Sequence, residues 1–415
     1  MKSRIACLGL LISAFNCPVS ASEIEWSGNY EHEIALATQG QQRLIKSENL
    51  LGIEAVGDLV DIQYRIDGRY RHDFQDTLDT DRNEFQFREA YLEKRWDYAS
   101  LRAGKQTIVW GQADGIRLLD KINSLNFREF IPDDYDNSRI ARTAVTLTVP
   151  MGRGSELSAS VIPEHAANRY PDPGYRFSMA LMPEFPVNTQ VIAEPLHEPD
   201  LSLHDSDIAV RYATFIGSWD IALHGYRHYL ADPAVRLRVS PGQITITPEF
   251  ERNTMIGVGA NNAFGDFVFR SELVYNTSYY YQTLNPQEQF LSKSPEAQSV
   301  LGLDYSGISD NLLSVQWFQW RTLEHQGDFA NEKVKNTLTF LWRQFYMNNS
   351  LSTEILHIQE LNTNEDGLFR ANIKYELTDD ILIKSGADVF FGPEQGLYGQ
   401  FNRKDQITAG IEVSF

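Results

Sequence analysis

Residues 406–415 read Gln-Ile-Thr-Ala-Gly-Ile-Glu-Val-Ser-Phe, and an apolar side chain occupies every second position from Ile407 to Phe415. Small or polar side chains fall between them. A period of two residues places the two kinds of side chain on opposite faces of an extended strand. This stretch is therefore predicted to be a β-strand with one apolar and one polar face.

An amphipathic strand that stops on an aromatic residue resembles the closing strand of a bacterial outer-membrane β-barrel. In such proteins the barrel-insertion machinery reads this strand, and the resemblance assigns the signal to Ile411, Val413 and Phe415. The alternative is an amphipathic edge strand of a soluble sheet. The rest of the chain has to decide between the two.

The N-terminal residues indicate export from the cytoplasm. Two basic residues precede an apolar run at residues 5–15, and the small residues in 18–21 offer a cleavage site. This is the layout of a secretory signal peptide, and the run is too short to span a membrane. We expect residues 1–21 to be the signal peptide and residues 22–415 to form one domain.

Composition excludes several classes of protein. The formal charge is −19, and it becomes −21 without the leader's Lys2 and Arg4. A nucleic-acid binder would present a basic face, so no nucleic-acid partner is expected. Cys7 and Cys17 are the only cysteines and both lie in the leader. The mature chain would then have no disulfide and no cysteine-based zinc site.

Alternation of apolar and polar residues is the dominant pattern after residue 21. Residues 60–71 place Val, Ile and Tyr on one face and Asp, Gln and Arg on the other, and 267–276, 369–377 and 381–391 repeat the pattern. A tilted strand needs about nine residues to cross a bilayer, whereas a soluble sandwich strand has roughly five or six. These long strands predict an all-β, single antiparallel transmembrane barrel.

Short turns and long polar connections alternate along the chain, as periplasmic turns and extracellular loops do in outer-membrane barrels. Counting them predicts about 20 strands, with both termini on the periplasmic side. The weakest strands are 177–182 and 187–193, and without them the count is 18.

Charged side chains of both signs fall on the faces predicted to point inward. A barrel of roughly 16 or more strands leaves an aqueous channel unless something plugs it. Opposed charges in such a channel select hydrated solutes, although an ion-pair network that fills the lumen would use the same residues. The candidates to line the lumen are Arg65, Asp67, Arg69, Arg71, Arg211, Arg270, Glu272, Arg370, Lys374, Lys384 and Asp388.

The connection at residues 109–138 differs from the others. Asp114 can cap a short helix in which Ile116, Leu119 and Ile122 recur on one side. Because an apolar face needs a surface to bury against, we expect this loop to fold inward and narrow the lumen. The alternative is a helix that lies on top of the extracellular loops. The charges expected at the constriction are Lys105, Asp114, Arg117, Asp120, Arg128 and Glu129.

The same segment carries a family resemblance. Its Gly-Lys-Gln at 104–106, Trp-Gly at 110–111 and Asp-x-Ile-Asn at 120–123 resemble a motif of uncharacterised outer-membrane barrel proteins of proteobacteria. Ser124 and Asn126 stand where that family usually has Pro and Asp. More distantly, the segment is similar to alginate-export and other substrate-selective porins. The resemblance implies an outer-membrane barrel with a transport-like role.

We therefore expect a porin-like channel for a small or medium polar solute, in contact with outer-membrane lipids and lipopolysaccharide. The alternative is a plugged barrel that serves as the outer-membrane component or scaffold of an export system. That protein would need a periplasmic or inner-membrane transport partner. An adhesin or receptor would rest on the long loops 230–250 and 281–296 alone.

Catalysis and metal binding are not expected. The chain lacks the Gly-x-Ser-x-Gly and His-Glu-x-x-His motifs of hydrolases and metalloproteases. His224 and His228 share one strand face, but four residues of strand place them roughly 13 Å apart, too far to chelate one metal. No catalytic residue, cofactor or metal ligand is therefore predicted.

Overall fold

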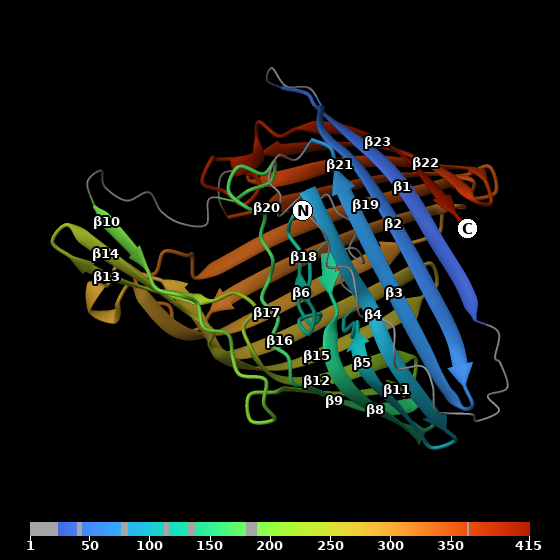
Figure 1. Ribbon diagram of the computed structural model, residues 1–415, viewed down its shortest axis with the longest axis horizontal. Helices are drawn as coiled ribbons and strands as arrows, with labels where there is room; N and C mark the ends of the chain where they lie inside the picture. The colour runs from blue at the N-terminus through green and yellow to red at the C-terminus, as the bar shows by residue number, and fades with distance from the viewer. Residues whose placement is uncertain are drawn as a thin grey trace, which may run out of the picture.

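The computed structural model describes residues 24–39, 44–75, 82–111, 116–130, 138–179, 189–362 and 365–415. Within them, an 18-stranded antiparallel sheet closes into a barrel (Figure 1). The last strand pairs with the first through residues 406–414 and 29–37. The ring therefore has no free edge, which is what a lipid environment demands. The expected signal peptide, residues 1–21, lies outside the described residues.

The barrel strands, in ring order, are β1 (Glu25–Ala37), β2 (Leu44–Leu59), β3 (Ile62–Asp73), β4 (Asn83–Trp96), β5 (Ala99–Gln106), β8 (Arg142–Gly152), β9 (Ser155–Ile162), β11 (Asp207–Ile216), β12 (Trp219–Tyr229), β15 (Arg252–Phe264), β16 (Phe267–Gln282), β17 (Leu291–Tyr305), β18 (Asn311–Thr322), β19 (Val334–Tyr346), β20 (Leu351–Glu360), β21 (Gly367–Thr378), β22 (Ile381–Phe391) and β23 (Gln406–Ser414). The remaining elements are β6 (Ser124–Leu125), β7 (Arg139–Ile140), β10 (Gln190–Ala193), β13 (Ala234–Ser240), β14 (Gln243–Glu249) and the 3-10 turns η1 (Pro286–Glu288) and η2 (Gly399–Phe401).

The two faces of the barrel wall differ as the alternation predicts. On β15 and β16, Ile256 and Leu273 are more than half exposed on the outside, while Met255 and Val274 are buried on the inside. An exposed apolar band around a barrel is the surface that meets lipid. Among the described residues, no helix is long and apolar enough to cross a membrane.

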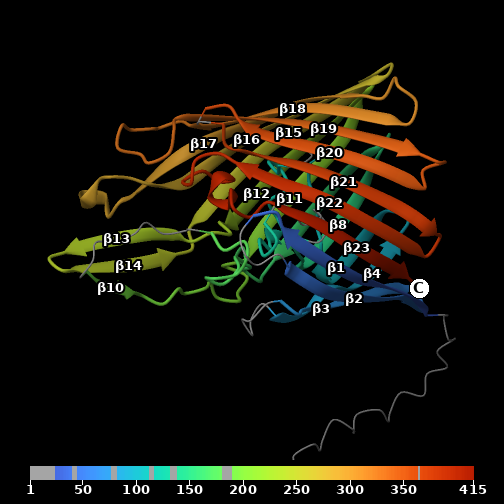
Figure 2. The same cartoon turned by 90° about the horizontal axis from the view of Figure 1, so that it is seen from above.

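The two ends of the barrel are built differently. Short turns, the C-terminus and the start of β1 lie together at one end, where Phe415 and Gly28 exchange backbone hydrogen bonds of 2.8 and 2.9 Å. The opposite end carries the long connections. There β10, β13 and β14 form a small sheet that extends beyond the barrel, away from the C-terminus (Figure 2). We call these the short-turn end and the loop end.

The barrel has 18 strands rather than 20, because β9 pairs directly with β11 over residues 156–162 and 207–213. The described parts of the two strands expected at 177–182 and 187–193 are therefore not part of the wall. Phe177 is fully buried in the interior, and β10 pairs with β14 outside the ring. Residues 180–188 lie outside the described part. The apolar run was read as a lipid-facing strand, whereas its phenylalanine packs inside.

The short helix expected in loop 109–138 is absent from the described residues 116–130. Asp114, the expected cap, lies outside them. Leu118 and Leu119 are both buried, so the apolar side chains do not share one helical stripe. Several backbone N–H groups here bond to partners outside the segment, as Leu119 N does with the Glu272 carboxylate at 3.3 Å and Phe127 N with Arg169 O at 2.8 Å.

Candidate functional site in the barrel interior

The connection from β5 to β8 turns into the barrel directly after Gln106. This side chain is 1% exposed, and its amide donates to the Ala144 carbonyl at 2.9 Å. Next, the Asn123 amide accepts from Ile108 N at 3.3 Å and donates to Ile108 O at 2.7 Å. These bonds tie the entry of the connection to its interior part. We call residues 116–130 the inner segment.

An apolar anchor holds the inner segment against one side of the wall. Leu118, Leu119 and Ile122 are at most 1% exposed. They pack against inward-pointing residues of β8 to β18: Ala144, Ile162, Ala209, Tyr226, Met255, Val274, Val300 and Phe318.

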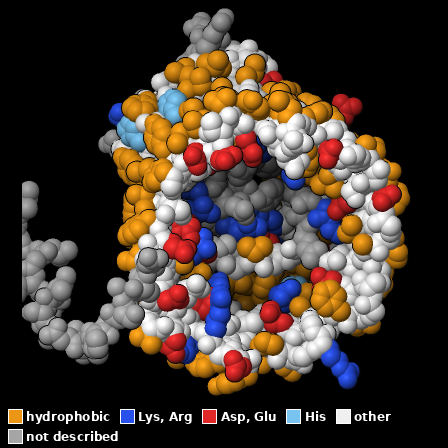
Figure 3. All heavy atoms as spheres, turned by 90° about the vertical axis from the view of Figure 1, so that its right-hand side faces the viewer, with side chains coloured by type: hydrophobic (Ala, Val, Ile, Leu, Met, Phe, Trp, Pro, Cys, Tyr) orange, Lys and Arg blue, Asp and Glu red, His pale blue; other side chains and the backbone are white. Residues whose placement is uncertain are grey.

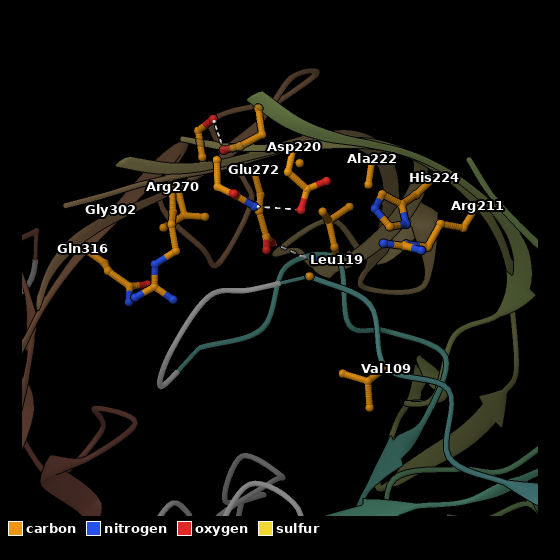
Figure 4. A pocket seen from close by; sticks show the side chains of 16 residues that line it. Val109, Leu119, Arg211, Asp220, Ala222, His224, Arg270, Glu272, Gly302 and Gln316 are labelled. Carbon is orange, nitrogen blue, oxygen red and sulfur yellow. Dashed lines mark hydrogen bonds between the residues drawn. The ribbon is translucent and has the colours of Figure 1, made fainter. Parts of the chain in front are cut away.

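The fit of the apolar anchor depends on glycine in β15. A Cβ at Gly257 would lie 2.3 Å from Leu119 Cδ2, so only a glycine leaves room for this leucine. Figure 4 shows Leu119 pointing toward the wall beside Glu272 and His224, around a small pocket of about 80 Å³. The wall and the loop are thus complementary in shape at this point.

A charged anchor holds the inner segment on the opposite side. Arg128 is 1% exposed; it donates to Glu48 at 2.6 Å and lies 3.6 Å from Asp73. Glu129 lies 3.7 Å from the Lys46 ammonium and accepts from the Tyr175 hydroxyl at 2.8 Å. We call the ionised groups of this region the charged cluster: Glu33, Lys46, Glu48, Arg71, Asp73, Arg128, Glu129 and Arg176.

The connection from β9 to β11 contributes a second piece of the interior. Its Arg169 exchanges backbone hydrogen bonds of 2.8 Å with Leu125 and Phe127 of the inner segment. Its Arg176 donates to Asp73 at 2.6 Å and also pairs with Glu129. The two connections therefore form one hydrogen-bonded body inside the barrel.

A second apolar cluster completes the contacts of this body with the wall. Phe130 of the inner segment and Phe177 of the second connection are 4% and 0% exposed. They pack against Leu341, Leu356, Ile358, Leu368, Phe390, Tyr398 and Phe401 of β19 to β22 and η2. The inner segment is held on three sides.

The charged cluster favours the ionised forms of Glu129 and Arg176. Burial alone would raise the pKa of Glu129, but the attraction of Arg176, Lys46 and Arg128 outweighs burial and holds this pKa well below its ordinary value. Burial opposes the charge of Arg176 as well, and the fields of Glu129, Tyr175 and Glu48 raise its pKa. Burial next to Glu129 raises the pKa of Tyr175, so this phenol stays neutral and donates. The anchor is thus a set of fixed charges at neutral pH.

Two larger cavities lie on either side of the interior body. The outer cavity, about 640 Å³, opens toward the loop end between the inner segment and β16 to β20. The inner cavity, about 620 Å³, lies at the short-turn end and is bordered by Phe415 and Gly28. Figure 3 shows the barrel mouth at the short-turn end as a hollow whose rim and walls carry charges of both signs.

Asp120 lies between the two cavities. Its carboxylate pairs with Arg117, which lines the outer cavity, at 3.7 Å. It also pairs with Arg139, which lines the inner cavity, at 2.9 Å. Asp120 itself is only 7% exposed. This triad of Arg117, Asp120 and Arg139 links the lining of one cavity to that of the other.

Of the charges expected at the constriction, the structure brings together two groups. Arg128 and Glu129 are in the charged cluster, and Arg117 and Asp120 are in the triad. Lys105 is different: it belongs to β5 and falls on the face opposite the buried Gln106. Asp114 lies outside the described residues.

The residues expected to line the lumen lie on the inner face, and most are engaged in ion pairs. Arg65 lies 3.2 Å from both Glu54 and Glu89. The other pairs are Asp67–Arg88 at 3.9 Å, Arg71–Glu48 at 3.7 Å, Arg211–Glu156 at 3.6 Å, Arg270–Asp304 at 2.8 Å, Arg370–Asp388 at 2.8 Å and Lys384–Glu412 at 2.7 Å.

Three of these candidates are placed by other contacts. Arg69 is buried and lines the inner cavity. Glu272 accepts from the backbone of Leu119. Lys374 stands opposite Lys384 in the register of β21 and β22. At the C-terminus, Ile411 and Phe415 are exposed and Val413 is half-buried, whereas Glu412 between them reaches Lys384.

Several interior residues were missed from sequence. Lys46 and Glu48 are buried two positions apart on β2, but the polar Ser47 and Asn49 stand next to them, so apolar–polar alternation does not reveal them. Asp73, between His72 and Phe74 at the end of β3, gives no clear alternation either. Tyr175 and Arg176 had no such signal, because their stretch ran into a segment read as a strand. Arg142 was missed too; it donates to Ile122 O at 3.1 Å and pairs with Asp207 at 3.0 Å.

The closed ring of 18 strands, the exposed apolar band and the loops packed inside together define a porin-type transmembrane barrel. The chain belongs to the family described as protein of unknown function DUF1302, whose model matches residues 51–409. No curated protein matches. Membership of a family of uncharacterised barrels was expected; the motif at residues 104–123 stays a resemblance.

Solved structures with a similar fold come from Pseudomonas aeruginosa. OpdK with vanillate is 7% identical, with a TM-score of 0.54, and the match covers 95% of this chain and 98% of that chain. OccD3 (OpdP) is 8% identical, with a TM-score of 0.54 and coverage of 94% and 91%. OccK2 (OpdF) in complex with glucuronate is 7% identical, with a TM-score of 0.53 and coverage of 95% and 97%. At these identities the similarity concerns the fold.

Proposed function

We propose that the protein is an outer-membrane, porin-like channel for a small or medium polar solute. One observation carries this: cavities of about 640 and 620 Å³ lie at opposite ends of the barrel, and the β5–β8 connection borders both. The outer cavity would face the exterior. The short-turn end, with both termini, would face the periplasm, as in other barrels of this type.

We place the constriction at the triad of Arg117, Asp120 and Arg139. Its members pair at 3.7 and 2.9 Å and connect the two cavities. Charges of both signs at a narrow point orient a hydrated solute and select among solutes. The two anchors hold this point in place, because Leu119 and Arg128 fix the inner segment on opposite sides. Loop 109–138 would thus narrow the lumen.

The structural neighbours are consistent with this proposal. OpdK and OccK2 have been solved with the small organic molecules vanillate and glucuronate. A barrel of the same fold can therefore take up a polar organic molecule. The constriction of this chain has to be judged from its own residues, because the identities are 7%.

Single-channel recording in planar bilayers tests the proposal. The purified protein should give discrete conductance, and deleting residues 115–126 should increase it because the inner segment is removed. Asp120→Asn should shift ion selectivity toward anions, since Arg117 and Arg139 lose their shared carboxylate. Asp266→Asn, in an exposed short turn, is the matched control and should leave selectivity unchanged. Absence of conductance in both the full-length and the deleted protein would refute the channel.

A second candidate is a plugged barrel that serves as the outer-membrane component or scaffold of an export system. The apolar side chains beside the inner segment in the outer cavity, such as Phe127, Phe130 and Trp320, favour it. They would suit a lipid-like cargo better than a hydrated ion. Such a protein should co-purify from native membranes with a periplasmic or inner-membrane transport partner, and a barrel that purifies alone and conducts argues against it.

A further inference from the structure

The outer cavity has the size of a ligand site and an unusual lining for an aqueous channel. Its volume of about 640 Å³ falls in the range of roughly 300–1,000 Å³ that is typical of small-molecule pockets. Apolar side chains of the inner segment form one wall and aromatic residues of β16 to β18 form the other. The apolar and aromatic lining comprises Ile116, Leu125, Phe127, Phe130, Tyr281, Trp320, Leu397 and Tyr398.

These apolar side chains are supported from behind and keep their positions. Phe127 stacks on Tyr170 at 5.1 Å, and Trp320 stacks on Phe318 at 6.0 Å. Apolar surface that faces an open cavity contributes nothing to protein stability until something covers it. A rigid apolar lining in an otherwise charged lumen therefore suits the body of an organic molecule.

The outer cavity also contains a cation, Lys121, whose ion pairing differs from that of the other cations there. Lys335 pairs with Glu360, and Arg117 pairs with Asp120 at 3.7 Å. Among the described residues, by contrast, no carboxylate lies within ion-pair distance of the Lys121 ammonium. Burial lowers the pKa of Lys121, and the more distant Glu296, Asp120 and Asp232 only partly offset this.

The nearby carboxylate of Glu296 is already engaged. It accepts from the Tyr281 hydroxyl at 2.6 Å and from the Gln298 amide at 2.5 Å. These bonds keep it in place as an acceptor and leave the Lys121 ammonium free for another anion. An ammonium without an ion-pair partner in a partly apolar cavity gains strongly from an incoming carboxylate.

We infer that the outer cavity is a binding site for an amphipathic organic anion. A flat apolar body would lie between Phe127 and Trp320, and one carboxylate or sulfonate would meet Lys121. This names the substrate class for the channel and rests on the proposed function. Hydrated inorganic ions lack the apolar body that this cavity would bind, and neutral sugars lack the negative charge.

The test is calorimetric titration of the full-length protein in lipid nanodiscs with three probes. 2-Naphthoate carries both the body and the charge, 2-naphthamide carries the body alone, and succinate carries charge alone. We expect 2-naphthoate to bind at least roughly tenfold more tightly than either of the others, as a charge-assisted hydrogen bond predicts. Equal affinities for 2-naphthoate and 2-naphthamide, or no binding of 2-naphthoate, would overturn the inference.

Two variants assign the binding to its residues. Lys121→Met should weaken 2-naphthoate binding by roughly tenfold or more and leave 2-naphthamide binding unchanged, whereas Lys121→Arg should retain the preference for the anion. Lys374→Met removes a lysine that lines a different pocket of the interior and is the matched control. Unchanged binding by Lys121→Met contradicts the inference. Heat-modifiable migration on gels confirms that each variant is folded.

Conductance is measured on the same preparations, so the two proposals can fail separately. If the barrel conducts ions but does not bind 2-naphthoate, the proposed binding site is refuted and the proposed channel function stands. If the barrel binds 2-naphthoate but never conducts, the proposed channel function is refuted and the proposed binding site stands.

Discussion

Replacing Gly257 by alanine should loosen the inner segment, because the new methyl group would enter space that Leu119 occupies. The added Cβ would lie 2.3 Å from Leu119 Cδ2. Carbon atoms in contact rest at roughly 3.5–4.0 Å, so one of the two groups has to move by more than about 1 Å. Leu119 is 1% exposed, so a movement of that size disturbs its buried contacts in the apolar anchor. Overpacking of this kind typically costs about 1–3 kcal/mol.

Gly259 provides a matched control on the same inner face of β15. A Cβ there would lie 3.4 Å from Leu119 Cδ1, which is close to ordinary contact. Alanine has the same intrinsic preference at both positions, so the difference between the two variants isolates the clash. We expect Gly259→Ala to change the free energy of unfolding by less than about 0.5 kcal/mol.

Two measurements check the prediction. Urea unfolding in detergent, followed by tryptophan fluorescence, should show a loss of about 1–3 kcal/mol for Gly257→Ala relative to Gly259→Ala. Single-channel recordings should show larger or more variable conductance for Gly257→Ala alone.

A double variant shows whether the clash with Leu119 is the cause. In a Leu119→Ala background the colliding methyl group is gone, so adding Gly257→Ala should cost almost nothing. The reasoning is refuted if the penalty persists in that background, or if Gly257→Ala and Gly259→Ala are indistinguishable.

Three further predictions concern the charged anchor and the C-terminal strand. Arg128→Met removes one of the four cations that balance the four carboxylates of the charged cluster, and it should lower the free energy of unfolding by about 3–5 kcal/mol in urea titrations. Arg343→Met, which breaks the more exposed pair with Glu354, should cost at most about 1 kcal/mol. Because the pKa of Glu129 is depressed, its contribution is complete above its unfolded pKa of about 4.3 and is lost only as pH falls through the lower folded value. The charged anchor should therefore hold from pH 8 to pH 5, and a single-channel conductance that rises near pH 6 would contradict it. Deleting Phe415 should reduce the amount of barrel assembled in cells, measured by heat-modifiable migration of membrane fractions. Protein refolded in detergent, which needs no insertion machinery, should be affected much less, and equal losses in both would argue for a purely structural role.

The wall of the barrel could be predicted from sequence because the alternation of side chains within each strand shows which face points inward. Arg69 and Arg71 are two residues apart, and both are buried inside as a period of two requires. The closing strand was equally readable, and it pairs with β1 as expected. Alternation of apolar and polar residues therefore predicts which side chains of each strand face inward.

The interior could not be predicted in the same way, because its contacts join residues far apart in the chain. Arg128 bonds to Glu48, 80 positions away, and no local pattern connects them. The buried Phe177 belongs to an apolar run that looks the same whether it faces lipid or packs inside. The spacing of Ile116, Leu119 and Ile122 suggested a helix, yet the backbone of this segment bonds to residues far away in the chain such as Arg169 and Glu272.

The closure of the ring between β1 and β23 has a consequence for how the molecule assembles. This seam joins positions separated by most of the chain, so it is the slowest contact to form by chance. Lys46, Glu48 and Asp73 lie on the first strands beside it. Lys46 and Glu48 have partners on the wall as well, but the ion pairs of Asp73 are with Arg128 and Arg176 of the two interior connections. A ring that closed around an empty interior would leave Asp73 without these counterions, at a cost of several kcal/mol. We therefore expect the barrel to close productively only after the two interior connections have entered it.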